Sequence, residues 1–320
     1  MTKFILCFIS IIVLSATCTG GEVDTLLSTQ NRTDLNYIPQ LPDGTIWQSH
    51  TDINSLKLGI VVGGMIAAEV AGMLYWNYTW YDVKTGSFHF KEFSNDMKVY
   101  QKMDKLGHMT HAFAITDLFA KAYRWSGFSA RSSIWWASAT AFFWMLQIEI
   151  KDGFYPDWGF SYGDFGANVL GISIAALRQF YPEQLGGFRF KVSYHVSSAY
   201  RLKLYTNKNV GHPEDYEGLT FWATANIYDF MPKNIQRNYP AWLKPFGLAV
   251  GYSVKKVAND VYGGYHETYL SLDIDLTKIS LGGFDQFGTV RFLKDIFNYL
   301  KLPLPTVRLS PEATYVGFYF

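Results

Sequence analysis

Apolar positions in the first half of the chain recur with helical spacing. Long apolar segments at residues 58–76, 133–148 and 168–177 predict three helices. The first carries one charge, Glu69, and is just long enough to cross a bilayer, although its small residues suit close packing against another helix nearly as well. With a further helix expected around residue 108, the pattern predicts a helical core domain at residues 57–186, a bundle of about four apolar helices.

Beyond residue 187 the hydrophobic period changes to two. Alternation and aromatic or β-branched residues predict strands at 188–196, 199–206, 219–227, 246–254 and 268–276, a short amphipathic helix at 291–300 and a last strand that reaches Phe320. A terminal Phe after alternating apolar residues is typical of outer-membrane barrels, but a bacterial barrel needs at least about eight strands. About six are visible here, so an antiparallel sheet or partly curled barrel is favoured over a full membrane-spanning barrel.

The predicted fold class is therefore α+β, with a helical core at 57–186 followed by an antiparallel β region at 187–320. Residues 1–18 have the layout of a signal peptide, because Lys3 precedes an apolar run and small residues follow it. Residues 19–56 form a polar lead-in. Cys18 is a candidate for lipid attachment, although Thr17 stands where a small residue usually precedes the modified cysteine. Cys7 lies inside the signal, so the mature chain offers no disulfide and no cysteine metal site.

Composition favours a membrane-associated protein over a nucleic-acid-binding one. Charged residues make up 17% of the chain and aromatic residues 18%. Tyr and Trp prefer the interface between lipid and water. The 28 basic and 27 acidic residues give a net charge of +1, so no basic excess indicates nucleic acid. We expect an exported envelope protein, in the outer membrane or the periplasm of a Gram-negative bacterium, whose partner is the membrane.

Two polar clusters flank the apolar helix expected at 133–148. In the first, Asp104, His108 and His111 are spaced four and three apart, so a helix presents all three on one face. That arrangement suits an imidazole oriented by a carboxylate, as a general base requires, or a pair of metal ligands. The second cluster places two acids at the end of one helix and the other polar groups around the start of the next: Glu149, Asp152, Asp157, Ser161, Asp164 and Asn168.

Capping explains part of the second cluster. Ser161 and Asp164 stand where a helix should begin, and helix N-termini favour hydroxyls and carboxylates. Glu149 ends an apolar helix at the unfavourable end of the helix dipole, so Lys105 and His108 are its expected partners. Asp157 reads as a turn residue, and Glu69 has no local partner.

These residues are candidates for catalysis or metal binding, but they do not match a known catalytic motif. The catalytic candidates are His108, Asp104, Glu149, Asp152 and Asp164, and a divalent metal would be held by His108, Glu149 and Asp164. The sequence has no HExxH, no G-x-S-x-G, no phosphate-binding glycine loop and no dinucleotide fingerprint.

Four motifs carry a family resemblance. The first is an FHFF-N-D opening, which corresponds to "FHFKEFSND" at residues 88–96 with extra residues between its aromatic and acidic parts. The others read D-K-x-G-H, E-x-x-D-G and S-x-x-D-x-x-A-N-x-x-G, and fall on Asp104, Lys105, Gly107 and His108, on Glu149, Asp152 and Gly153, and on Ser161, Asp164, Ala167, Asn168 and Gly171. The chain resembles the YfiM-like family of predicted periplasmic lipoproteins of unknown function, in its long Bacteroidetes-type form, over nearly all residues after 58. It is more distantly similar to VanZ-like membrane proteins. That kinship implies that Lys105, His108, Asp164 and Asn168 meet at one place, but it implies no reaction.

Three functional hypotheses follow. The first is a structural or envelope-maintenance role, in which the polar cluster ties the helices together. The second is an envelope hydrolase that acts on a lipid or cell-wall substrate, with His108 as general base oriented by Asp104. The third and weakest is a channel or transport accessory, with Glu69 and Glu149 along a polar path.

Overall fold

The computed structural model describes residues 47–81, 84–205 and 212–319, all within one compact unit, Pro39–Phe320. The predicted signal peptide at 1–18, Cys18 and most of the lead-in at 19–56 lie outside the described residues.

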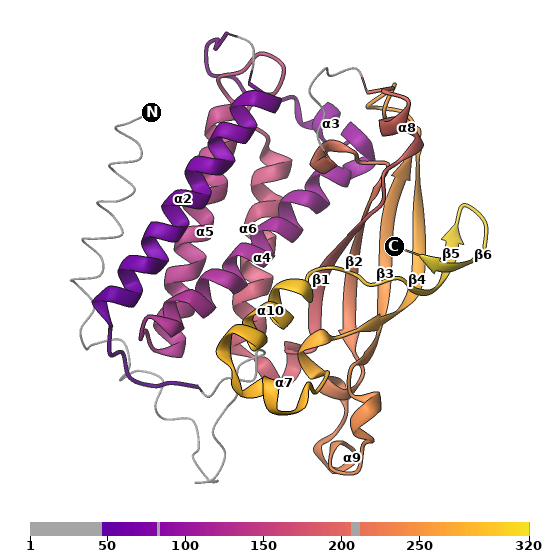
Figure 1. Ribbon diagram of the computed structural model, residues 1–320. Helices are drawn as coiled ribbons and strands as arrows, with labels where there is room; N and C mark the ends of the chain where they lie inside the picture. The colour runs from indigo at the N-terminus through magenta and orange to yellow at the C-terminus, as the bar shows by residue number, and fades with distance from the viewer. Residues whose placement is uncertain (1–46, 82–83, 206–211, 320) are drawn as a thin grey trace. The chain divides into compact units, whose positions relative to one another are not determined.

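Four long helices form the first part of the unit (Figure 1): α2 (Ser55–Thr79), α4 (Met103–Trp125), α5 (Ala130–Asp152) and α6 (Tyr162–Phe180). Helix α4 packs against α5, α6 and α2, and α5 also packs against α6. Helices α2, α5 and α6 begin at polar caps, where Asn54, Ser129 and Ser161 accept hydrogen bonds from backbone N–H groups. Short helices connect these elements, namely α3 (Phe93–Asp96), η1 (Val99–Lys102) and α7 (Pro182–Leu185).

Six antiparallel strands form the second part, in the order β1-β2-β3-β4-β5-β6. They are β1 (Phe188–Tyr194), β2 (Leu219–Asn226), β3 (Phe246–Lys255), β4 (Tyr265–Ile274), β5 (Leu304–Ser310) and β6 (Thr314–Tyr319). The α+β class and the order of helices before sheet are thus as the sequence predicts. The connections contain α8 (Ser198–Arg201), η2 (His212–Glu214), η3 (Tyr228–Phe230), α9 (Lys233–Gln236), η4 (Ala241–Leu243), η5 (Leu276–Lys278), η6 (Gly282–Gln286) and α10 (Gly288–Phe297).

Two strand assignments differ from the sequence prediction. Of the strand expected at 199–206, the described residues 199–205 do not form a strand: Ser197 caps the short helix α8 by accepting a hydrogen bond from Tyr200 N at 2.9 Å. The alternating Leu202 and Leu204 that suggested a strand are exposed, 68% and 39%. Conversely, β5 was missed because Pro305 lies inside it, and proline lacks the N–H group that a strand interior normally uses.

The sheet curls. The ring of Tyr319 on β6 stacks on Tyr269 of β4 with centroids 4.5 Å apart and lies 6.2 Å from Trp222 of β2. In a flat sheet, β6 would run about 19 Å from β2, because neighbouring strands are about 4.8 Å apart. A side-chain contact across that span therefore requires curvature.

Buried contacts join the helical and β parts. Phe113 of α4 packs edge-on against Phe190 of β1, with ring centroids 5.2 Å apart. Asp117 of α4 pairs with Arg178 of α6 at 3.1 Å and accepts a 2.6 Å hydrogen bond from the hydroxyl of Tyr299, which follows α10. We propose that the division near residue 187 separates two kinds of secondary structure that share a core.

Candidate functional site

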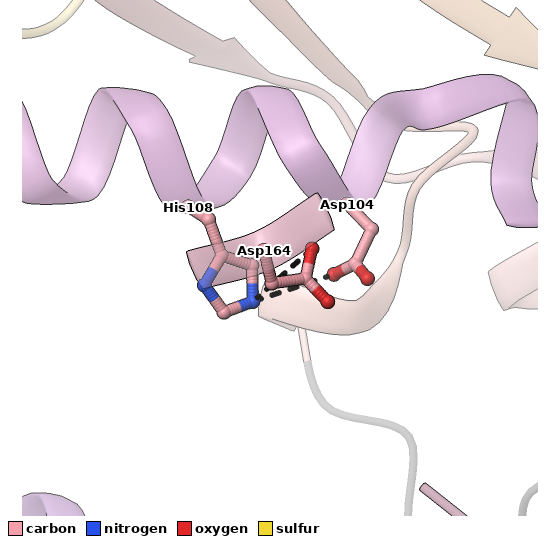
Figure 2. Close-up of side chains that lie close together, drawn as sticks. All are labelled: Asp104, His108 and Asp164. Atoms are coloured by element: carbon pink, nitrogen blue, oxygen red, sulfur yellow. Dashed lines mark ion pairs between the residues drawn. The ribbon is translucent and has the colours of Figure 1, made fainter. Parts of the chain in front are cut away.

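The first turns of α4 supply an acid and an imidazole to one cluster. Asp104 and His108 are four residues apart and lie on one face of the helix, with Asp104 Oδ1 3.8 Å from His108 Nε2. Figure 2 shows both side chains beside Asp164 of α6, whose Oδ1 is 4.0 Å from the same nitrogen. Two elements that are far apart in sequence therefore direct their carboxylates at one side of the imidazole.

Lys105 is the cation that joins the carboxylates. Its Nζ lies 2.7 Å from Asp96 Oδ1, 2.9 Å from Asp164 Oδ1 and 3.4 Å from Asp104 Oδ2. Lys105 is 8% exposed and Asp96 1%. The ammonium therefore links α3, α4 and α6 in surroundings that exclude most water.

The start of α6 is built into this network. Ser161 Oγ accepts a 2.9 Å hydrogen bond from Asp164 N and donates one of 2.7 Å to Asp96 Oδ2. A Cβ on Gly163 would lie 2.5 Å from Asp96 Oδ2, so a larger residue there would displace the Asp96 carboxylate. Ser161 is thus both the helix cap that the sequence predicts and a partner of a buried acid.

Helix α5 contributes Glu149 from its interior. The helix continues to Asp152, so Glu149 does not end it as the sequence analysis expected. Glu149 is 1% exposed and accepts a 2.9 Å hydrogen bond from Asn168 Nδ2. Asn168 Oδ1 is in turn 3.1 Å from His108 Nδ1, and Glu149 Oε1 is 3.3 Å from it. The second nitrogen of the imidazole therefore faces acceptors from α5 and α6.

Other predicted residues lie around this centre or apart from it. Asp152 accepts a short hydrogen bond from Tyr81. His111 is exposed and lines the cavity described below, and Asp157 lies in a turn. Glu69 accepts a short hydrogen bond from Gln147, and neither Glu69 nor Glu149 lines the cavity described below.

Gly171 has a packing role. A Cβ there would lie 2.2 Å from the carbonyl oxygen of Met109 on α4. Its missing side chain lets α6 approach α4 closely, which brings Asp164 and Asn168 to His108.

The β region also reaches the site through a strained segment. Tyr100, Gln101 and Lys102 all adopt left-handed backbone angles, with φ of 47°, 53° and 67°, directly before α4. Such angles cost non-glycine residues on the order of 1 kcal/mol each. Tyr252 of β3 donates a 2.7 Å hydrogen bond to the carbonyl of Gln101, and Tyr216 donates one of 3.1 Å to Asp104 Oδ1. Contacts from the β region thus hold the start of α4 in place.

Four residues of the site are not among the candidates that the sequence predicts: Asp96, Tyr81, Lys91 and Tyr216. Asp96 had a signal, since it is the acidic end of the opening motif "FHFKEFSND". Lys91 Nζ lies 3.3 Å from Asp96 Oδ1. The two tyrosines carry no spacing signal, because they come from distant parts of the chain.

The family comparison covers the elements that build this cluster. Residues 92–180 match the family model described as "Predicted periplasmic lipoprotein (DUF2279)". The match extends from Glu92, just before α3, to the end of α6 and contains Asp96, Lys105, His108 and Asp164. It indicates an exported envelope protein and is consistent with membrane association, while the narrower YfiM-like and VanZ-like kinship stays a prediction.

No curated protein and no solved structure matches the chain.

Charge crowding shifts the protonation of the cluster. Burial by itself lowers the pKa of His108, but the charges of Asp164, Glu149 and Asp104 outweigh it and raise that pKa to about 9. Burial raises the pKa of Glu149 to about 8 and that of Asp152 to about 7. Burial also acts to raise the pKa of Asp104, but His108 and Lys105 outweigh it and lower that pKa. At neutral pH, His108 is therefore an imidazolium beside an ionised Asp104.

A cavity of about 480 Å³ opens beside the cluster. His108 and Asp104, whose side chains are 19% and 20% exposed, line it together with Asp152 and Asp164. Much of its remaining lining is aromatic or aliphatic: Tyr75, Trp76, Trp80, Val99, Tyr100, Met145, Ile148, Trp158, Tyr205, Tyr216, Leu219 and Phe221. The cavity thus combines a large apolar wall with the acids and imidazole of the cluster, and its lining also includes Lys91, His111 and Glu214.

A metal ion would find a different ligand set from the one expected. One ligand atom each from Asp104, His108 and Asp164 lie within 4.8 Å of one another, so Asp104 takes the place of Glu149 in the grouping. The ammonium of Lys105 already pairs with both of these carboxylates. A divalent cation would therefore compete with Lys105.

Proposed function

We propose that this is an envelope protein that binds an amphipathic lipid or cell-wall substrate in the cavity and hydrolyses it at His108. The observation that carries the proposal is the position of His108. It stands between a buried ion network on one side and a cavity with an apolar wall on the other. Ligand sites commonly combine such a wall with a few polar groups that orient the ligand.

The hydrogen bonds around His108 support a role as proton donor. Asn168 donates its amide to Glu149, so its Oδ1 faces His108 Nδ1 and requires a proton on that nitrogen. His108 Nε2 lies 3.8 Å from Asp104 Oδ1, too far for a direct hydrogen bond, and therefore stays available to a ligand. The raised pKa of His108 supports a general acid, in contrast to the general base that the sequence suggested.

Asp104 and His108 together can carry out the proton transfers of the corresponding hydrolysis. Asp104 takes a proton from a water molecule while the oxygen of that water attacks the carbonyl or phosphoryl centre of the substrate. His108 Nε2 gives its proton to the leaving oxygen or nitrogen as that bond breaks. Transfer of the proton from Asp104 back to His108, directly or through water, restores both groups.

The full-length protein in mild detergent should convert an extract of envelope lipids or cell-wall fragments to hydrolysed products detected by mass spectrometry. Asp104→Asn and His108→Gln should each lower turnover at least a hundredfold, because acid–base groups contribute roughly 10²–10⁴ in rate. His266→Gln is the matched control, since His266 lies exposed on β4 outside the cavity lining. Turnover that persists in His108→Gln would refute the proposal.

A structural role is the second candidate, and the buried Lys105 network favours it. Three carboxylates surround one ammonium that is 8% exposed, an arrangement that fixes three helices. If His108→Gln unfolds under conditions where the parent is stable, and no substrate is found, the network serves packing alone. Elemental analysis of the purified protein tests the metal version, which requires a stoichiometric divalent ion.

A further inference from the structure

The two faces of the curled sheet have opposite polarity. At alternating positions in the middle of β3, β4 and β5, a group of apolar side chains remains partly exposed. These are Leu248 (46%), Val250 (54%), Leu270 (42%), Leu272 (40%) and Val307 (37%), here called the outer patch. Leu248 pairs with Leu272, and Leu270 pairs with both Val250 and Val307, so the patch is continuous across three strands.

The opposite face is polar and buried. Lys191 of β1, 1% exposed, pairs with Asp273 of β4 at 2.9 Å. Ser271 and Thr306 are 3% and 1% exposed and share a 2.8 Å hydrogen bond. A sheet with one face in water normally buries its apolar side chains and exposes its polar ones. Here the order is reversed, as in membrane β-strands, whose apolar side chains face lipid while the polar ones face inward.

Part of the apolar face is already covered by protein. On β1 and β2 the same face packs against α4, where Phe190 meets Phe113 and Phe221 lies against Gly107. On β3 the cover extends to Tyr252, which donates to the carbonyl of Gln101, and to Val254, which is buried with Met103. The outer patch begins beyond them, on the rest of β3 and on β4 and β5. Its side chains continue the apolar surface that the helix covers elsewhere, so something apolar is required over it as well.

We propose that the outer patch lies against the hydrocarbon of a lipid bilayer. No Asp, Glu, Lys or Arg stands at the outward positions of β3 and β4, which are 246, 248, 250, 252 and 254 on β3 and 266, 268, 270, 272 and 274 on β4. Both strands have 10 residues, the length of a strand that crosses a membrane. The exposed middle of this surface is apolar, which matches hydrocarbon, while His266 and Thr268 lie at one end of β4 and Val254 is buried in the same cluster as Met103.

Aromatic side chains at both ends of the strands support the same occupant. Trp242, 71% exposed, precedes β3, while Tyr262, 53% exposed, lies in the β3–β4 hairpin. Trp and Tyr at the two ends of an apolar band are the pattern of residues at lipid headgroup level.

Helix α2 supplies a second apolar surface in the same unit. Among the described residues it alone is long and apolar enough to cross a membrane, and only Val61, Met65 and Thr79 of its side chains are buried. In Figure 1, the axis of α2 and the axes of the antiparallel strands β1 to β4 are inclined in a roughly similar way. A bilayer that accommodates the length of α2 would therefore also meet the strands along their length.

Depth-dependent quenching tests this proposal, and it does not depend on the proposed hydrolysis. The full-length protein carrying Val250→Cys is labelled with an environment-sensitive fluorophore and placed in vesicles of phosphatidylethanolamine and phosphatidylglycerol with nitroxide groups on the acyl chains. Leu270→Cys provides a second site on the outer patch. Asn234→Cys on α9 is the control, because Asn234 is exposed and polar and lies outside the patch. The unsubstituted protein gives the background from native cysteines.

We expect blue-shifted emission and several-fold stronger acyl-chain quenching at positions 250 and 270 than at 234. Equal quenching at all three positions would overturn the proposal. Labels at 250 and 270 that are shielded from water but unquenched by lipid would also overturn it, because a second copy or another protein would then cover the patch.

Discussion

Replacing Lys105 by methionine tests whether the ion network holds the helices together. The change keeps most of the apolar stem but removes the ammonium, which lies within 3.4 Å of three carboxylates. Breaking a buried ion pair costs about 3–5 kcal/mol, because the remaining charge is left without compensation. Asp96 retains Lys91 at 3.3 Å, whereas Asp164 keeps only His108 at 4.0 Å. We therefore expect the free energy of unfolding to fall by about 3 kcal/mol.

The measurement is urea unfolding in mild detergent, followed by tryptophan fluorescence. Lys233→Met is the matched control, since Lys233 pairs with Glu183 at 3.9 Å while both side chains are largely exposed, 66% and 44%. Such surface pairs contribute about 0–1 kcal/mol. Adding Asp164→Asn to Lys105→Met should recover part of the loss, because it removes the uncompensated carboxylate. Equal effects of the two lysine substitutions would refute the view that Lys105 ties α3, α4 and α6 together.

Two further predictions concern pH and helix packing. The pKa of His108 is raised from 6.5 to about 9 on folding, so its contribution to stability is complete below pH 6.5 and is lost as the pH rises through about 9. The melting temperature should therefore fall over this range in the parent and fall less in His108→Gln, and parallel curves would contradict the assignment. Gly171→Ala should lower the free energy of unfolding by about 1–3 kcal/mol, because its Cβ would meet the Met109 carbonyl at 2.2 Å. The control is Gly166→Ala in the same helix, where no atom lies within 4 Å of the new Cβ, so the free energy of unfolding should rise by up to about 1 kcal/mol. If urea unfolding shows that both alanine variants change the free energy of unfolding in the same direction, close packing of α6 on α4 is contradicted.

The sequence determined the features that depend on neighbours along the chain. Helical spacing located α2, α5 and α6, and alternation located β2, β3 and β4. The same spacing placed Asp104 and His108 on one helix face, and Ser161 read correctly as a helix cap. These inferences succeeded because period and capping are set within a few residues.

Only the tertiary structure decided what distant segments bring to the site. Asp96, Tyr81 and Tyr216 reach the cluster from separate elements, and no spacing rule connects them with Asp104 or Asp152. The protonation of His108 likewise depends on three acids from three different helices. Alternation of apolar and polar residues predicts that the sheet has two different faces, but it does not predict which face is buried. The curl of the sheet and the packing of α4 on β1 and β2 decide that the polar face is enclosed and the outer patch is exposed.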